Sequence, residues 1–233
     1  ARYRKGWAYG KAPNDFLVAA AATHMRDSSS PLAILSLGEG QGRNAVHLAT
    51  LGHLCTGVDS SPVGLSKALA LAAQSGVRAG VHTVVADLCD KDFSPSSIPP
   101  PKGARKAAAM VTAHWDVVVS IFCALPPADR RRVHRRCAEA LRKGGIVIIE
   151  AFAPGHATAV AAAERERHVT VEAAGSDGAS QGVGAMGSDS DGCFAHGKTW
   201  TRSGPTDAAL LVSPDDLRSD FAGFDVLECR EVR

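Results

Sequence analysis

Short, continuous apolar runs alternate along the chain with longer segments bounded by helix start and stop signals. Runs of this length are typical of strands that are buried on both faces, as in a parallel sheet. We therefore predict strands at residues 32–37, 53–58, 81–86, 115–122, 146–152 and 223–232.

The segments between these runs predict helices. Pro13-Asn14-Asp15 and Ser60-Ser61-Pro62 are typical helix starts, and Gly52, Gly76 and the pair Gly144-Gly145 are typical ends. Strands that alternate with helices predict one α/β domain over residues 1–233, with a mostly parallel twisted sheet and helices on both faces. The helices are expected at about 13–26, 43–51, 60–75, 126–142 and from 213 onward.

Three segments depart from this alternation. Residues 1–27 are a polar and aromatic stretch that leads into the first predicted helix. Residues 94–113 hold several prolines and a basic patch, which predicts a mobile loop insertion. Residues 173–192 are rich in Gly, Ser and Asp, and they cannot bury enough apolar surface to offset their ordering entropy, so we expect a disordered insertion.

Composition narrows the class of protein. Hydrophobic residues make up 45% and charged residues 21%, which is ordinary for a globular domain. The net charge of +2 is too small to indicate a nucleic-acid partner, and no apolar run reaches the roughly 20 residues that span a bilayer. We expect neither partner. The basic run 130–136 lacks interleaved aromatic residues and is expected to be a solvated helix face.

Cysteine usage bears on location and metal binding. The six cysteines are dispersed, and none has zinc-ligand spacing, so we expect no metal site and a reducing, cytoplasmic compartment. The chain starts at Ala1 rather than Met, so we expect its natural N-terminus to be missing, and organelle targeting stays open. The sequence gives no indication of the oligomeric state.

The pattern that carries chemistry is a glycine loop between a strand and a helix. Gly38-Glu39-Gly40-Gln41-Gly42 follows the first strand, and Asp59 ends the second. Glycines let a ligand approach the backbone, and an acid at this place can accept hydrogen bonds from ribose hydroxyls. The GxGxG spacing favours S-adenosyl-L-methionine over a dinucleotide, whose enzymes use GxGxxG. The alternative is a turn that only closes a βαβ unit, with Asp59 as a solvated cap.

The run 35–46 resembles motif I of class I S-adenosylmethionine-dependent methyltransferases. Its Gly-Gln-Gly-Arg-Asn portion is similar to the tellurite-resistance and thiopurine-type branch, which acts on small molecules. Other motifs of that branch resemble four further segments of the chain, residues 7–17, 121–127, 141–145 and 150–152. The resemblance implies a Rossmann-like class I methyltransferase fold, S-adenosyl-L-methionine as cofactor, and a small-molecule acceptor such as a thiol, selenium or tellurium compound.

The resemblance also assigns roles around the methionine half of the cofactor. Gly38, Glu39 and Gly40 would pass that end of the molecule, and Ser120 and Phe122 would lie near it from the fourth strand.

Other residues would surround the adenosine half. Asp59 would hold the ribose, Ser60 and Ser61 would flank the adenosine, and Asp87 and Leu88 would border the adenine. Asn44, from the helix that follows the glycine loop, would cap that loop.

A lid is implied over cofactor and substrate. Trp7, Tyr9 and Pro13 would belong to the lid, and Cys123 and Phe152 would lie on the substrate side, where Cys123 either touches the substrate or is an apolar wall residue. No catalytic residue stands out, because methyl transfer from a sulfonium needs mainly alignment and exclusion of water. The weak candidates for a direct role in catalysis are Cys123, Arg43 and Tyr9.

The chain departs from the family pattern at several points. Position 39 is Glu where many class I enzymes have Cys or Ala, and position 124 is Ala where relatives commonly carry His. The final antiparallel strand of the class I sheet is expected to be missing, because the chain stops at Arg233. Two alternatives therefore remain open: a protein that binds S-adenosylmethionine with reduced turnover, and an NAD-dependent oxidoreductase.

Overall fold

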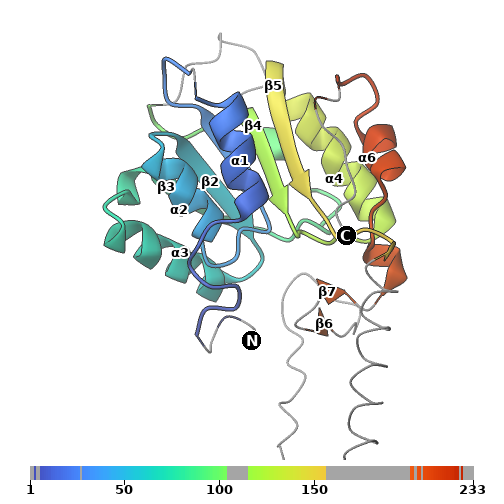
Figure 1. The fold of residues 1–233 in the computed structure, drawn as a ribbon, viewed down its shortest axis with the longest axis horizontal. Helices are drawn as coiled ribbons and strands as arrows, with labels where there is room; N and C mark the ends of the chain where they lie inside the picture. Colours follow the sequence, from blue (N-terminus) through green and yellow to red (C-terminus); the bar gives the residue numbers. More distant parts are fainter. Residues whose placement is uncertain are drawn as a thin grey trace, which may run out of the picture.

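Five parallel strands form the centre of the fold, in the order β3-β2-β1-β4-β5 across the sheet (Figure 1). The computed structural model describes residues 3, 6–26, 28–103, 115–155, 200–201, 204–205, 207–225 and 227. All four strand pairings are parallel, so the predicted α/β fold with a parallel sheet is confirmed. The strands are β1 (Ala33–Leu37), β2 (Leu54–Asp59), β3 (Val81–Val85), β4 (Trp115–Ile121) and β5 (Leu141–Glu150).

Helices cover both faces of this sheet. Among the described residues, no helix is long and apolar enough to cross a bilayer. Two short strands, β6 (Trp200–Thr201) and β7 (Gly204–Pro205), pair separately and antiparallel. The α-helices are α1 (Asp15–His24), α2 (Arg43–Thr50), α3 (Pro62–Gln74), α4 (Pro127–Ala140) and α6 (Pro214–Asp220).

Side-chain caps explain where three helices begin. Asn14 Oδ1 accepts from the main-chain N–H of Leu17 at 2.9 Å, and Ser61 Oγ caps α3 by accepting from Gly64 at 3.2 Å. At α6, Ser213 and Asp216 form a reciprocal capping box. These bonds satisfy N–H groups that have no partner inside the helix, which is why the predicted starts hold.

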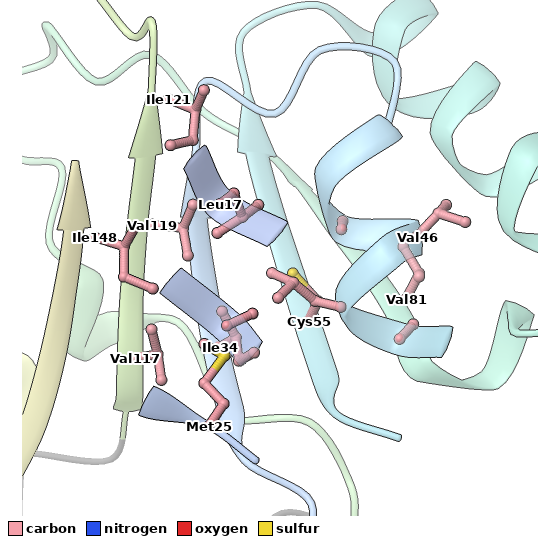
Figure 2. Packing of buried hydrophobic residues seen from close by; sticks show 14 of the residues in the cluster. Leu17, Met25, Ile34, Val46, Cys55, Val81, Val117, Val119, Ile121 and Ile148 are labelled. Atoms are coloured by element: carbon pink, nitrogen blue, oxygen red, sulfur yellow. The ribbon is translucent and has the colours of Figure 1, made fainter. Parts of the chain in front are cut away.

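Two hydrophobic cores lie on opposite faces of the sheet. Ile34, Cys55 and Val119 point to one face and pack with Leu17 of α1 and Val46 of α2 (Figure 2). Successive residues of a strand point to opposite faces, so each run serves both cores. The continuous apolar runs are explained by this double burial.

The second core joins the sheet to α4. Leu35 and Val118, each adjacent in sequence to a residue of the first core, pack with Val133 and Cys137 of α4. The fully buried Trp115 also belongs to this core, and its indole Nε1 donates to the main-chain oxygen of Pro95 at 3.1 Å.

The boundary between α4 and β5 differs from the prediction. The helix predicted over 126–142 ends at Ala140, and β5 begins at once with Leu141, ahead of the Gly144-Gly145 pair. Leu141 has extended backbone angles, φ −76° and ψ 142°, and pairs with Trp115. Strand pairing therefore overrides the local stop signal at the two glycines.

The strand predicted at 223–232 does not begin where expected. Gly223 has a φ of 94°, and the N–H of Phe224 donates to the carbonyl of Phe221 at 3.0 Å, which makes a turn after α6. Residue 226 and residues from 228 onward lie outside the described residues.

The two predicted insertions are described only in part. The expected disordered segment, 173–192, lies outside the described residues, as does 104–114 of the proline-rich loop. The first part of that loop packs against the body of the fold, because Pro95 and Ile98 are buried and the carbonyl of Pro95 accepts from Trp115.

The basic run 130–136 is a solvated face only in part: Arg131 and Arg135 are exposed, as its composition predicts, but Arg130 is not. Arg130 is only 4% exposed, and it donates to Asp216 at 2.9 Å and to Asp220 at 2.7 Å. His134 Nδ1 lies 2.8 Å from the same Asp220 carboxylate. A buried guanidinium is tolerated because carboxylates pair with it, and these pairs dock α6 onto α4.

Gly42 offers a test of helix packing. A Cβ on Gly42 would lie 2.5 Å from the Cβ of Ala68 in α3, and the residue has a φ of 89°. Gly52 has the same φ, but nothing lies within 4 Å of its Cβ position. We expect Gly52→Ala to cost about 1 kcal/mol from backbone strain, and Gly42→Ala to cost about 3 kcal/mol from strain and overpacking. Denaturant unfolding followed by circular dichroism measures both, and equal losses would contradict the close packing of α2 on α3.

Candidate functional site

The strand order creates a topological switch point between β1 and β4. From this point the connections run to opposite sides, and in open α/β sheets ligands bind there, beyond the carboxyl ends of the strands. Gly38 follows β1, and Phe122 and Cys123 follow β4. A Cβ on Gly38 would lie 2.8 Å from Cys123 Sγ, and the φ of Gly38 is 60°. The two segments therefore touch, and only glycine fits between them.

Asp59 ties the glycine loop to the end of β2. Its Oδ2 accepts from the main-chain N–H of Gly40 at 2.8 Å, and its Oδ1 accepts from that of Ser61 at 2.8 Å. The residue is 8% exposed. Both oxygens of the carboxylate therefore accept main-chain hydrogen bonds at the point where β2 ends. The alternative of a solvated cap does not fit this burial.

Glu39 turns its carboxyl toward β1 and α2. Ser36 Oγ donates to Oε2, the main-chain N–H of Ala45 donates to Oε1 at 3.0 Å, and Glu39 is 8% exposed. A Cβ on Gly57 of β2 would lie 2.7 Å from Glu39 Cγ, so the missing side chain at Gly57 makes room for the acid. Burial, together with the negative charge of Asp59, raises the pKa of Glu39 to about 7, although both hydrogen bonds act the other way.

The side chain of Asn44 makes a different hydrogen bond from the cap on the glycine loop that we expected. Its Oδ1 accepts from the main-chain N–H of Asn14 at 3.0 Å, and Asn14 Nδ2 donates to Glu150 Oε2 at 2.6 Å. This buried chain joins α2, the start of α1 and the end of β5, so Asn44 fixes the first helix beside the switch point.

The residues expected around adenosine lie at neighbouring strand ends. Asp59 of β2 is in register with Val85 of β3. Asp87 and Leu88 come two and three residues after Val85. Asp87 is exposed, and its Oδ1 accepts from the N–H of Cys89 at 2.8 Å, whereas Leu88 is buried. Ser60, half-buried, directly precedes the N-cap of α3.

The end of β4 carries a backbone outlier. Phe122 has a φ of 52°, the one positive value at a non-glycine residue in the described part of the chain. Its N–H donates to the carbonyl of Glu150 at 2.8 Å, and its ring centroid lies 4.6 Å from that of Phe152. Such strain is concentrated at functional sites, where the surroundings hold it in place. Ser120, two residues earlier, is buried within β4.

Trp7 and Tyr9, two of the residues expected in a lid, belong to a segment that we call the strap, residues 6–11. Gln41 of the glycine loop accepts from the N–H of Ala8 at 2.6 Å and donates to the carbonyl of Gly6 at 2.9 Å. Lys67 Nζ of α3 donates to the same carbonyl at 2.8 Å. The strap is thus fixed to the glycine loop and to α3. Sequence reasoning missed Gln41, because its role depends on a segment 33 residues away.

The aromatic residues of the strap point in different directions. Trp7 packs against the core beneath α1 and carries Lys11 Nζ 4.9 Å from its ring centroid. Tyr9 is 45% exposed, with the Arg43 guanidinium 5.7 Å from its ring, and Arg43 also donates to its carbonyl at 3.5 Å. Pro13, beyond the strap, is half-buried. The structure brings Arg43 to the strap, but it places the Trp7 ring on the core.

Tyr3 is a site residue that the sequence did not single out. A Cβ on Gly40 would lie 2.8 Å from Tyr3 Oη, and a Cβ on Gly64 would lie 3.0 Å from Tyr3 Cδ2. The ring therefore covers the glycine loop and the first turn of α3, beside the Asp59 carboxylate that Gly40 contacts. An aromatic residue in a polar terminal stretch was the only signal, and Trp7 and Tyr9 share it.

Comparison with known proteins supports the fold. No protein-family model matches the sequence, and no curated protein matches it either. A solved structure concerned with the conversion of a disulfide bond into a thioacetal group during echinomycin biosynthesis is 23% identical, with a TM-score of 0.57. That match covers 96% of this chain and 72% of the other.

Two further solved structures are less similar. The CcbJ methyltransferase from Streptomyces caelestis is 25% identical over 66% of this chain and 56% of its own, with a TM-score of 0.48. TehB from Haemophilus influenzae is 22% identical over 62% of this chain and 43% of its own, with a TM-score of 0.46. The matched part thus spans little more than half of CcbJ. With the strand order 3-2-1-4-5, the chain has the Rossmann-like α/β fold typical of class I methyltransferases.

Replacing Glu39 by Gln should remove a titration that opposes folding. The free carboxyl titrates near 4.5 and the folded one near 7, so the native state holds the proton more tightly. Wild-type stability therefore falls as the pH rises between these values, by on the order of 3 kcal/mol, and does not fall further above them. The free energy of unfolding of Glu39→Gln should exceed that of the wild type more at pH 8 than at pH 5.

Glu139→Gln is the matched control, because the Glu139 side chain is 64% exposed on α4. It should follow the wild-type pH profile. A difference between wild type and Glu39→Gln that stays constant from pH 5 to pH 8 would show that Glu39 is ionised throughout.

Gln41→Ala should release the strap. The substitution removes two hydrogen bonds, each contributing about 1 kcal/mol, so the amide of Ala8 should exchange its hydrogen at least about tenfold faster. Gln74→Ala, at the exposed end of α3, should leave that exchange rate unchanged. Equal rates in all three proteins, measured by hydrogen–deuterium exchange, would show that Gln41 does not hold the strap.

Proposed function

We propose that the protein transfers a methyl group from S-adenosyl-L-methionine to a small-molecule acceptor. The observation that carries this proposal is the Asp59 carboxylate, which is buried at the end of β2 and bonded to the N–H of Gly40 in the glycine loop. A carboxylate at this point can accept hydrogen bonds from ribose hydroxyls, and it lies beside a loop of left-handed glycines at the switch point, within a fold typical of class I methyltransferases.

The residues present fit this nucleoside. Asp59 would hold the ribose, because its carboxylate lies at the end of β2, beside the glycine loop and the first turn of α3. Gly38 and Gly40 would border the amino-acid half, and Asp87 and Leu88, at the next strand end, would border the base. When bound, S-adenosyl-L-methionine supplies a methyl group already activated on a sulfonium.

The work of this chain is alignment and exclusion of water. Phe122 and Phe152 form an apolar wall beyond β4 and β5, and the strap closes the side of the glycine loop. Cys123 Sγ packs on Gly38, which suits a wall position. The Asp59 carboxylate beside the glycine loop would favour a cationic nucleoside over a neutral one. Holding reactants in line in a dry crevice supplies most of the acceleration that such a displacement needs.

The acceptor that best suits these surroundings is a soft, polarizable nucleophile. An aromatic wall favours a weakly hydrated sulfur, selenium or tellurium centre over a strongly hydrated oxygen anion. A thiol of this kind needs little help from a protein base once it has ionised.

Binding of S-adenosylhomocysteine, measured by calorimetry, tests the proposed site. We expect wild type to bind this product and not NAD, and Asp59→Asn to weaken binding by about 1–3 kcal/mol, because an amide replaces one acceptor oxygen by a donor. Glu139→Gln, on the exposed face of α4, should bind as wild type does. Undiminished affinity in Asp59→Asn would place the nucleoside elsewhere.

Turnover is tested separately, with labelled S-adenosyl-L-methionine and thiol, selenite and tellurite acceptors. Transfer of label to any of them supports an enzyme of this class. Tight binding of S-adenosylhomocysteine without transfer to any acceptor would instead favour a protein that binds the cofactor with reduced turnover.

A further inference from the structure

Two arginines of α4 reach across to the segment that follows β3. Arg132 Nη2 donates to the carbonyls of Leu88 and Asp90, each at 3.1 Å. Arg136, one turn further along the helix, donates through Nη1 to the carbonyls of Lys91, at 2.6 Å, and Phe93. Together they bind four main-chain carbonyls within one short segment, residues 87–93.

This segment depends on such bonds. It contains no helix or strand, and its internal hydrogen bonds run from the N–H groups of Cys89, Asp90, Asp92 and Phe93 to oxygens of Asp87 and Asp90. Those bonds leave the carbonyls of Leu88, Lys91 and Phe93 to other donors, and Arg132 and Arg136 supply them.

The arginine contacts are held in place at both ends. Arg132 Nη1 pairs with Asp129 at 2.5 Å, which fixes the guanidinium from the helix side. Leu88 and Phe93 are 1% and 8% exposed and pack in the same core as Val133 of α4. Apolar anchors therefore fix the distance of the segment from α4, and the two guanidinium groups fix the orientation of its peptide groups.

The segment borders the place where the base of a nucleoside would lie. Val85, the last residue of β3, is in register with Asp59, and the N–H of Ala86 donates to the carbonyl of Asp59 at 3.2 Å. Asp87 is exposed at this edge, and Leu88 follows it. A nucleoside whose ribose is held by Asp59 would thus present its base to polar groups whose positions depend on Arg132 and Arg136.

We propose that Arg132 and Arg136 are positioning residues that give the nucleoside site its preference for adenine. They would act through segment 87–93, by holding its hydrogen-bonding groups where the 6-amino group and ring nitrogens of adenine can pair with them. This inference rests on the proposed function, since it assumes that a nucleoside binds at Asp59. It also assigns a role to two members of a basic run that composition alone predicts to be solvated.

The test compares two ligands that differ only in the base. S-adenosylhomocysteine carries adenine, and S-inosylhomocysteine carries hypoxanthine, with an oxygen in place of the 6-amino group. Calorimetry would give the Kd of each for wild type, Arg132→Ala and Arg136→Ala. The matched control is Arg135→Ala, on the same helix, whose exposed side chain lies 3.9 Å from Glu139.

We expect wild type to bind the adenine ligand at least tenfold more tightly than the hypoxanthine ligand. In Arg132→Ala the Kd of the adenine ligand should rise about tenfold while that of the hypoxanthine ligand changes less than threefold, so the preference collapses. Arg136→Ala should show a smaller loss of preference, Arg132→Lys an intermediate one, and Arg135→Ala none. Hydrogen exchange at residues 88–93 should accelerate in Arg132→Ala, whereas exchange in β1 and β4 should not.

The outcomes separate this inference from the proposed function. If wild type binds neither ligand, both the proposed function and the inference are overturned. If wild type prefers adenine and Arg132→Ala keeps the same ratio of the two Kd values, only the inference fails. An equal rise of both Kd values, or unchanged exchange at residues 88–93, would likewise reduce the arginines to a general structural role.

Discussion

The paired hydrogen bonds from Gly40 and Ser61 to the Asp59 carboxylate hold together three parts of the fold. They join the loop after β1, the end of β2 and the first turn of α3. The loop takes its left-handed path because Gly38, Gly40 and Gly42 carry positive φ values of 60°, 62° and 89°. A glycine backbone has little preference among the conformations open to it, and the hydrogen bonds to the carboxylate select one of them. The strap and Tyr3 then have a fixed surface on which to lie.

Two acidic side chains near this loop are placed in contrasting surroundings. Asp59 faces main-chain N–H groups at the strand end, whereas Glu39 lies between Ser36 and the start of α2, where burial raises its pKa to about 7. The two carboxyls therefore have different structural roles. Asp59 ties the glycine loop to the start of α3, and Glu39 supports the loop from the side of β1 and α2.

The predictions from sequence are confirmed where local residue patterns determine the structure. They are wrong where pairing between distant residues determines it. Continuous apolar runs located all five strands of the sheet, because both faces of each central strand are buried, and an acid directly after a strand located Asp59. The glycine pair at 144–145 predicts the end of α4 too far along the chain, because pairing of Leu141 with Trp115 starts β5 ahead of these glycines. The basic run 130–136 misled for a similar reason. Arg130 finds its carboxylates 86 and 90 residues away, and no local pattern encodes that distance.

The docking of α6 on α4 has a consequence for how this chain tolerates change. Asp216 and Asp220 bind Arg130, and the N–H of Val212 donates to the carbonyl of Phe152 at 2.8 Å, so the chain is clamped where it leaves the sheet and again where it returns. For a segment closed between two fixed points, the entropic cost grows only with the logarithm of its length, by about 0.6 kcal/mol per doubling. A change in the length of chain between these two clamps should therefore cost the domain little, as long as it spares the buried Leu210 and Leu211.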